Sequence, residues 1–175
     1  MHKPNPYGDS PSVDNSSFID PTAVVIGAVT IGKNVLIAPG AVIRADEPGS
    51  SIVIGDNCNI QDRVIIHALE ETTVSIDENT SLSHGCIVHG PCVIGKNCFI
   101  GFGSVVFKTK MEDDVCVKHL AVVENIDIPS GRLIESTRFI STAEDVKSLN
   151  PVDDEFKKFA ERVIFTNLEL TKKYL

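Results

Sequence analysis

Aliphatic residues recur at intervals of six along most of the chain. The interval holds from residue 19 to 43, resumes at 54 after a jump of eleven and at 76 after a jump of ten, and takes one five-residue step before 111. Glycine often follows the repeating residue directly, as in Ile54-Gly55 and Ile94-Gly95. The repeating positions are Ile19, Val25, Ile31, Ile37, Ile43, Ile54, Ile60, Ile66, Ile76, Leu82, Val88, Ile94, Ile100, Val106, Met111, Val117 and Val123.

A six-residue interval excludes a single helix or a plain strand as its source. Six residues turn an α-helix by about 600°, so the repeating side chains cannot stay on one face. A strand alternates with period two and gives no reason for six. A solenoid fits, because each hexapeptide can form a short strand and a tight turn, with its inward side chain stacked on the coil below.

The pattern resembles the hexapeptide-repeat left-handed parallel β-helix, in which three hexapeptides form one triangular coil. The left-handed sense comes from that resemblance, since parallel crossovers are ordinarily right-handed. The predicted fold class is therefore an all-β solenoid with a C-terminal α-helix packed alongside.

The two ends of the chain depart from the repeat. Residues 1–17, rich in Pro, Ser, Asn and Asp, are predicted to form an irregular arm, residues 18–130 the β-helix, and residues 131–175 a helical segment of the same single domain. Capping chemistry in 141–149 predicts a short helix there. A longer helix is expected from Asp153 or Asp154, with an apolar stripe that faces the outside of the β-helix. The stripe consists of Phe156, Phe159, Ala160, Val163, Ile164, Asn167 and Leu168.

Composition narrows the class of protein further. A length of 175 residues suffices for one well-buried core, and the absence of Trp with many Val and Ile residues favours strands. A formal net charge of −8 at pH 7 argues against nucleic acid or an anionic membrane as partner. The start has no apolar signal region and no run reaches membrane-spanning length, so a cytoplasmic location is expected.

The cysteines have an expected place in the solenoid. The chain has five, with no C-x-x-C pair. Four of them, Cys58, Cys86, Cys92 and Cys98, lie two residues before a repeating residue, where the side chain again points inward. We expect reduced thiols in the core, with a metal or redox role as the alternative.

Assigning the hexapeptides to three faces gathers candidate chemistry at one corner. If the long jumps are ordinary repeats with inserted loops, the repeats at 43, 66 and 88 share the first face. The alternative, a ten-residue jump made of shortened hexapeptides, is less natural. Arg44, His67 and His89 each follow a first-face repeat and form a column. Coils lie about 4.8 Å apart, so His67 and His89 can share a metal ion with bonds of about 2.0–2.1 Å. The inserted loops, 44–53 and 67–75, bring carboxylates to this corner: Asp46, Glu47 and Glu70.

His84 lies at a different corner, between the third and first faces, with Asp62 in the equivalent place one coil away. Five extended residues separate His84 from His89, about 17 Å along one edge. One chain therefore cannot offer all three imidazoles to one ion, whereas a neighbouring chain can. A trimer is the simplest closed arrangement, and it would also set Asp62 near Arg44 of the neighbour as an interface ion pair. His2 and His119 are expected to be ordinary solvated or hydrogen-bonded side chains.

Three segments carry a further resemblance: IRADE (43–47), NIQDRVIIHALE (59–70) and SLSHGCIVHGP (81–91). They resemble the motifs of γ-class carbonic anhydrases, and the similarity extends from about FIDPTAVVIG to the C-terminal helix. The resemblance implies a homotrimer with three interfacial zinc or iron(II) sites. It makes His67, His84 and His89 the ligands, completed by water.

The resemblance also implies roles for residues around the ion. It matches Gln61 to the residue that hydrogen-bonds the reactive hydroxide, and Asn167 to an amide that positions carbon dioxide. Glu47 corresponds to the carboxylate that takes a proton from water, and Glu70 to an outer proton shuttle. The residues that correspond to structural groups of the subunit interface are Arg44, Asp46 and Asp62.

The residue types suit this chemistry. Three neutral nitrogen ligands leave an open position and lower the pKa of bound water toward about 7. The resulting hydroxide attacks carbon dioxide to give bicarbonate, and a proton leaves through a carboxylate. One feature departs from the best-known members, whose long acidic loop after HALE carries the shuttle. Here only EETTVS follows, so Glu47 and Glu71 are alternative relays.

Two other functions share the fold. A hexapeptide-repeat acyltransferase sometimes uses a histidine base, but it does not call for stacked histidines with Gln61 and Glu47. A non-catalytic carbonic-anhydrase-like subunit of a larger assembly would have lost a ligand or relay residue, and none is missing here. The sequence therefore predicts a carbonic anhydrase, a lyase acting on carbon dioxide and bicarbonate.

Overall fold

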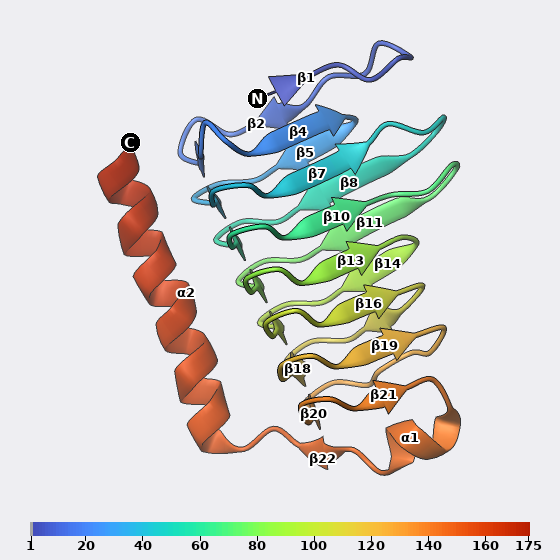
Figure 1. The fold of residues 1–175 in the computed structure, drawn as a ribbon. Helices are drawn as coiled ribbons and strands as arrows, with labels where there is room; N and C mark the ends of the chain where they lie inside the picture. The colour runs from blue at the N-terminus through green and yellow to red at the C-terminus, as the bar shows by residue number, and fades with distance from the viewer. Residues whose placement is uncertain (1) are drawn as a thin grey trace.

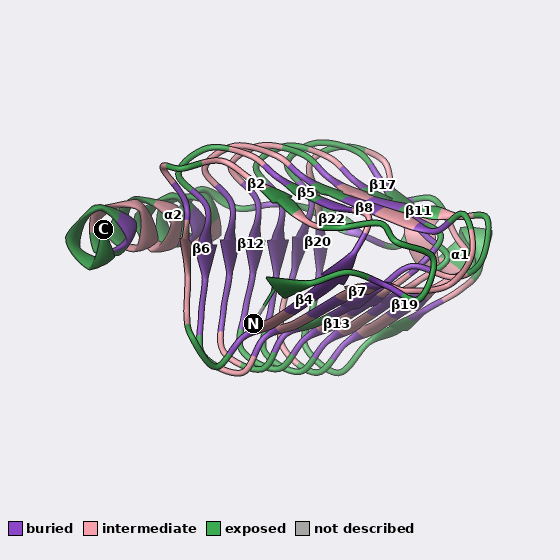
Figure 2. Cartoon of the chain, turned by 90° about the horizontal axis from the view of Figure 1, so that it is seen from above, coloured by how far each residue is buried: buried purple, intermediate pink, exposed green. Residues whose placement is uncertain are grey.

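The computed structural model, which describes residues 2–175, is a triangular β-solenoid with one long helix beside it (Figure 1). Three sheets run along its length, and seen from above they enclose a buried interior (Figure 2). Neighbouring strands are parallel apart from β20 and β22, which pair antiparallel. The predicted left-handed β-helix of hexapeptide repeats is confirmed.

Each sheet collects one face of successive coils. Sheet A contains β1 (His2–Lys3), β4 (Val24–Gly27), β7 (Val42–Ala45), β10 (Ile65–His67), β13 (Ile87–His89), β16 (Val105–Phe107), β19 (Val122–Glu124) and β21 (Phe139–Ile140). Sheet B contains β2 (Ser12–Val13), β5 (Val29–Ile31), β8 (Ser51–Ile54), β11 (Thr73–Ile76), β14 (Cys92–Ile94) and β17 (Lys110–Met111). Sheet C contains β3 (Phe18–Ile19), β6 (Leu36–Ile37), β9 (Asn59–Ile60), β12 (Ser81–Leu82), β15 (Phe99–Ile100), β18 (Cys116–Val117), β20 (Arg132–Ile134) and β22 (Asn150–Pro151).

The repeating side chains form the core. Ile43, Ile66 and Val88 are fully buried and lie in register on sheet A, as the face assignment predicts. The long jumps are therefore inserted loops between sheets A and B. All five cysteines are free and buried, and burial raises the pKa of the Cys58 and Cys86 thiols to about 12. These thiols are packing groups, as expected.

The solenoid is longer than the predicted range of 18–130. At its start, β1 pairs with β4 and β2 with β5, so the arm supplies part of an additional coil. The six-residue interval in fact reaches back to Val13, six residues before Ile19 and in register with Ile31, although turn residues surround it. At its end the six-residue interval in fact resumes after one five-residue step, at Ile128, Ile134 and Ile140, all fully buried.

Both predicted helices are present. The helix α1 (Ala143–Lys147) begins at a capping box between Thr142 and Asp145. The helix α2 (Asp154–Tyr174) is capped by Asp153 and returns along the outside of sheet C toward the N-terminal end (Figure 1). It packs through Ala160, Phe156 and Val163 against sheet C residues that include Phe99. Among residues 2–175, no helix has both the length and the apolar character needed to cross a membrane.

Candidate metal centre

The column at the corner between sheets A and B forms as predicted. Arg44, His67 and His89 are in register on β7, β10 and β13, each directly after a buried core residue, so their side chains point outward. His67 Nδ1 lies 3.1 Å from His89 Nε2, and Arg44 Nη2 lies 3.2 Å from His67 Nε2. The β-ladder alone therefore brings two imidazoles together.

The protonation of these two rings follows from their partners. Arg44 can only donate, so His67 Nε2 accepts and His67 Nδ1 donates to His89 Nε2. This leaves His89 Nδ1 buried without a hydrogen-bond partner. Burial, followed by the nearby Arg44 and His89, lowers the pKa of His67 below its usual 6.5. Both features favour neutral imidazole, the form that binds a metal ion.

The spacing of the two nitrogens also suits a metal ion. Two ligand atoms on a tetrahedral ion with bonds of about 2.0–2.1 Å lie about 3.3 Å apart. The observed 3.1 Å between His67 Nδ1 and His89 Nε2 is close to that value. For His67 to hold an ion through Nδ1 as a neutral ring, its proton would have to move to Nε2, which faces the Asp46 and Glu47 carboxylates. The donor set and its spacing therefore fit zinc or iron(II).

Carboxylates surround the column from the two inserted loops. Glu47 Oε1 lies 3.4 Å and Asp46 Oδ1 lies 3.5 Å from His67 Nε2. Glu47 Oε2 accepts a 2.6 Å hydrogen bond from the Glu70 backbone N–H, which joins the two loops. The carboxylate of the exposed Glu71 packs against Gly49, and a side chain on residue 49 would collide with that carboxylate. Glu47 is thus the carboxylate held at the histidines, and Glu70 lies outside it.

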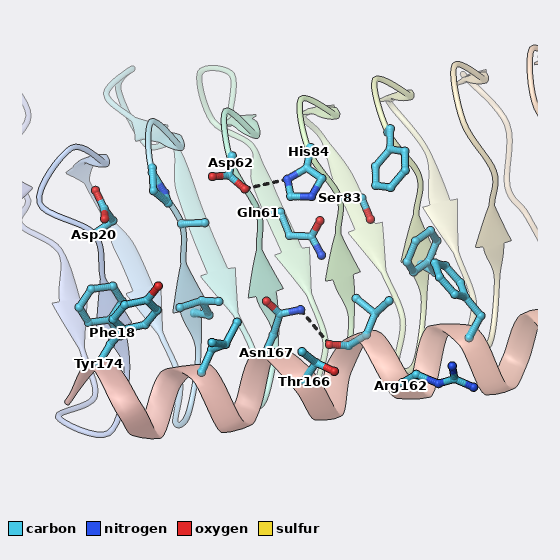
Figure 3. Close-up of a pocket in the computed structure, with 18 residues that line it drawn as sticks. Phe18, Asp20, Gln61, Asp62, Ser83, His84, Arg162, Thr166, Asn167 and Tyr174 are labelled. Atoms are coloured by element: carbon cyan, nitrogen blue, oxygen red, sulfur yellow. Dashed lines mark hydrogen bonds and ion pairs between the residues drawn. The ribbon is translucent and has the colours of Figure 1, made fainter.

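His84 lies at the other edge of sheet A, at the corner between sheets C and A. Its Nδ1 is 2.7 Å from Asp62 Oδ2, one coil away (Figure 3). The ring stacks on Phe102, which stacks in turn on His119. His119 Nδ1 accepts the Phe102 backbone N–H, which confirms its expected role as a hydrogen-bonded side chain. Asp62 thus meets His84 of its own chain, whereas its predicted pairing with Arg44 of a neighbour stays a prediction.

A cleft between sheet C and α2 opens beside His84, and we call it the α2 cleft. Its volume is about 530 Å³, and Gln61, Ser83 and Asn167 line it (Figure 3). Gln61 Nε2 donates to Asn59 Oδ1, and Asn59 Nδ2 donates to a hydroxyl on the next strand, that of Ser81. Gln61 Oε1 is buried and unpaired.

Asn167 faces Gln61 across the cleft from α2 (Figure 3). Its Nδ2 donates to the Val163 carbonyl of the same helix. The predicted site residues Gln61, Asn167 and His84 therefore lie together, apart from the column of His67 and His89.

Sequence reasoning gave Asn59 and Ser83 no role. Asn59 precedes and Gln61 follows the core residue Ile60, so both point outward beneath α2. The sequence did carry a signal for these residues: they are polar at positions that the apolar stripe of a helix should cover.

Within residues 2–175, no group of three or more His, Cys, Asp or Glu side chains is arranged to hold an ion. The two histidine sets instead border one uncovered face, the outside of sheet A. Along it runs an apolar column in continuous register, partly exposed throughout. We call it the sheet A stripe: Val24, Val42, Ile65, Ile87, Val105, Val122 and Phe139. Sheet C is covered by α2, so the sheet A stripe is the long apolar surface that the chain leaves open.

Known proteins match both the fold and these motifs. The repeat family described as bacterial transferase hexapeptide (six repeats) matches residues 10–45 and 73–108. A carbonic anhydrase of Methanosarcina thermophila is 35% identical, over 97% of this chain and 77% of its own length. A Nostoc carboxysome assembly protein, CcmM, is 38% identical over 98% of this chain, which spans only 33% of that protein. Among solved structures, a hexapeptide transferase family protein from Anaplasma phagocytophilum has a TM-score of 0.85 at 29% identity, covering 100% of this chain and 98% of its own.

These relatives show the family. The extent of the match to the Methanosarcina protein, together with a 34% identical γ carbonic anhydrase 2 from Arabidopsis thaliana mitochondria, agrees with the motifs at 43–47, 59–70 and 81–91. The chain belongs to the γ-class carbonic anhydrase family of hexapeptide-repeat β-helices.

Proposed function

We propose that the protein catalyses the reversible hydration of carbon dioxide to bicarbonate at metal sites shared between the chains of a homotrimer. The observation that carries the proposal is the placement of three histidines on the two edges of one open face. His67 and His89 lie in register at one edge of sheet A, and His84 lies at the other. A neighbour packed on that face can unite the two edges, and three chains close the arrangement.

His67 and His89 of one chain and His84 of the next would hold the ion, zinc or iron(II). When bound, a divalent ion with three neutral imidazole ligands lowers the pKa of water toward about 7 and supplies a hydroxide nucleophile. Asp62 supports this assignment: by accepting the His84 Nδ1 proton it leaves Nε2 bare for the ion.

The other site residues orient the reactants and carry the proton. Gln61 presents Oε1 as a fixed acceptor, because Asn59 holds its amide nitrogen. Asn167 faces it across the α2 cleft and is suited to position carbon dioxide. Hydration of carbon dioxide releases one proton, and Glu47 Oε1 is placed to take it, since Oε2 already accepts the Glu70 N–H. Glu70 is exposed and can pass the proton to buffer.

The test is stopped-flow hydration of carbon dioxide after anaerobic loading with iron(II) or zinc. We expect metal-dependent turnover in the parent and loss of turnover in His84→Ala and His89→Ala. Mixed trimers of these two variants should regain about a quarter of the sites, because half of the chains supply each intact ligand set. If the parent protein shows no metal-dependent hydration rate, the proposed enzymatic activity is refuted. Inactive mixed trimers, with mixing verified by native mass spectrometry, would refute sites shared between chains.

A second candidate is a binding or assembly role without catalysis. The similarity to the Nostoc carboxysome assembly protein over almost the whole chain favours it. It would be supported by a trimer that binds metal at the histidines yet shows no hydration. Transfer or hydrolysis of acetyl-CoA without metal would instead favour an acyltransferase.

A further inference from the structure

His84 lies at one end of a row of three stacked rings at the corner between sheets C and A. Its ring centre is 5.4 Å from that of Phe102 on the next coil, with 27° between the planes. Phe102 stacks in turn on His119 at 4.3 Å and 8°. On the preceding coil, Asp62 Oδ2 lies 2.7 Å from His84 Nδ1 (Figure 3). The His84 ring is therefore held between a carboxylate and an aromatic ring.

We propose that Phe102, supported by His119, is a positioning residue that holds the His84 ring in one orientation for the ion of the proposed metal centre. Both residues act through His84 and lie outside the motifs at 43–47, 59–70 and 81–91. This role rests on the proposed function, in which His84 is a metal ligand.

The row follows from the turn that recurs at this corner. Each of the three ring residues directly precedes a residue in the left-handed conformation, with φ between 56° and 68°. Gly103 N–H donates to the His84 carbonyl, which joins the first two turns, and Leu120 N–H joins the next two through the Phe102 carbonyl. Equivalent side chains are thereby set about 4.8 Å apart, within the 4.5–7 Å at which aromatic rings attract each other. The coil geometry therefore stacks any rings that occupy these positions.

His119 fixes Phe102 independently of His84. Its Nδ1 accepts the Phe102 backbone N–H at 3.1 Å, and its own backbone N–H donates to Ser136 Oγ at 3.3 Å. A Cβ on residue 101 would lie 2.9 Å from His119 Nδ1, so Gly101 lets the two turns come this close. The Phe102 ring therefore rests on a hydrogen-bonded ring and offers its other face to His84.

His84 needs this support because it is exposed. Its side chain is 57% exposed and that of Asp62 is 46% exposed, and an exposed ion pair contributes little by itself. A contact at one ring nitrogen also leaves the ring free to rotate about that contact, whereas stacking restricts the plane of the ring. A ligand that is ordered before binding loses less conformational entropy when the ion binds. The stack on Phe102 should therefore strengthen metal binding.

The test measures zinc affinity by chelator competition, and the His84 rotamer of the metal-free protein by three-bond NMR couplings to Cγ. Phe102→Ala should weaken zinc binding about threefold to tenfold, as expected for the loss of one aromatic contact, and should average the rotamer. Phe102→Tyr keeps the ring and should restore both values of the parent. His119→Ala should change both in the same direction but less, because Phe102 remains.

Leu120→Ala is the matched control. Leu120 is 65% exposed at the same corner, and its replacement removes an apolar side chain while the three rings stay in place. This variant should bind zinc like the parent. Light scattering checks that the parent and every variant have the same mass, so that a change in affinity does not come from a change in assembly.

The outcomes separate the role of Phe102 from the proposed function. A parent protein that binds no zinc would refute the metal centre and the role of Phe102 with it. If the parent binds zinc, unchanged affinity or an unchanged His84 rotamer in Phe102→Ala would overturn the role of Phe102 alone. The same holds if Leu120→Ala weakens zinc binding as much as Phe102→Ala does, since the loss of any apolar side chain at the corner would then have the same effect.

Discussion

At the scale of single residues, the site depends on which imidazole nitrogen is free. His84 Nδ1 lies 2.7 Å from Asp62 Oδ2, which orients the ring and makes Nε2 the nitrogen that a neutral His84 would offer to an ion. A carboxylate in this position also makes the imidazole a better ligand. Under the proposed function, Asp62 is therefore a positioning residue for His84 within its own chain, apart from any contact it makes with a neighbour.

Replacement of Asp62 by Asn should weaken zinc binding by about tenfold to 100-fold, because the amide no longer enforces the Nδ1–H tautomer. Zinc affinity can be measured by chelator competition, and the His84 tautomer by ¹⁵N NMR of the imidazole. Asp20→Asn is the matched control, since Asp20 bonds to Thr22 rather than to a histidine. Unchanged affinity and tautomer in Asp62→Asn would contradict the assigned role.

At the scale of the elements, each coil depends on a left-handed residue at the corner between sheets B and C. Asn34, Asn57, Asn79, Asn97 and Asp114 occupy it with φ between 54° and 60°. Their side chains form a ladder, in which Asn57 Nδ2 donates to Asn79 Oδ1 at 3.2 Å. Asparagine suits this position because it tolerates positive φ and its amide bonds to the next coil.

Asn79→Ala should lower the free energy of unfolding by about 1–2 kcal/mol, the cost of the left-handed conformation for a residue with a Cβ and no local hydrogen bond. Asn79→Gly loses the same ladder hydrogen bond but adopts the turn freely, so it should be less destabilised. Urea unfolding of the two variants compares them. A glycine variant no more stable than the alanine variant would show that the ladder hydrogen bond, and not the backbone, sets the cost.

At the scale of the whole molecule, the three outer faces differ in what covers them. Sheet C is covered by α2, and sheet B presents Thr30, Ser75 and Lys110 among its outward residues. Sheet A presents the sheet A stripe with nothing over it, between the two histidine edges. A continuous exposed apolar face of this kind marks an interface, and here it is the face that the proposed trimer requires.

Ile65→Glu should convert the proposed trimer to monomers, because it sets a charge within the sheet A stripe. Val53→Glu is the matched control on sheet B, since the exposed fractions of Ile65 and Val53 are 40% and 42%. Light scattering after size-exclusion chromatography measures the mass of each. Dissociation by both variants, or by neither, would argue against sheet A as the interface.

The six-residue interval of the sequence predicted most of the fold. The six-residue interval indicated the coil, and its interruptions at the two inserted loops placed Arg44, His67 and His89 in one column, because residues in register on a parallel ladder must stack. Spacing also separated His84 from that column. Val13 continues the interval at the start of the chain, and Ile128, Ile134 and Ile140 continue it at the end after one five-residue step, so the prediction stopped short of a period that the sequence carries.

Tertiary structure decided what lies between elements distant in sequence. The α2 cleft is lined by residues of sheet C and of α2, which are distant in sequence, so no local pattern encodes it. The contact of Asp62 with His84 and the proton between His67 and His89 likewise depend on side-chain directions across coils. The sequence repeat fixes where the backbone of each coil lies. The packing of side chains decides which polar atoms have a hydrogen-bond partner.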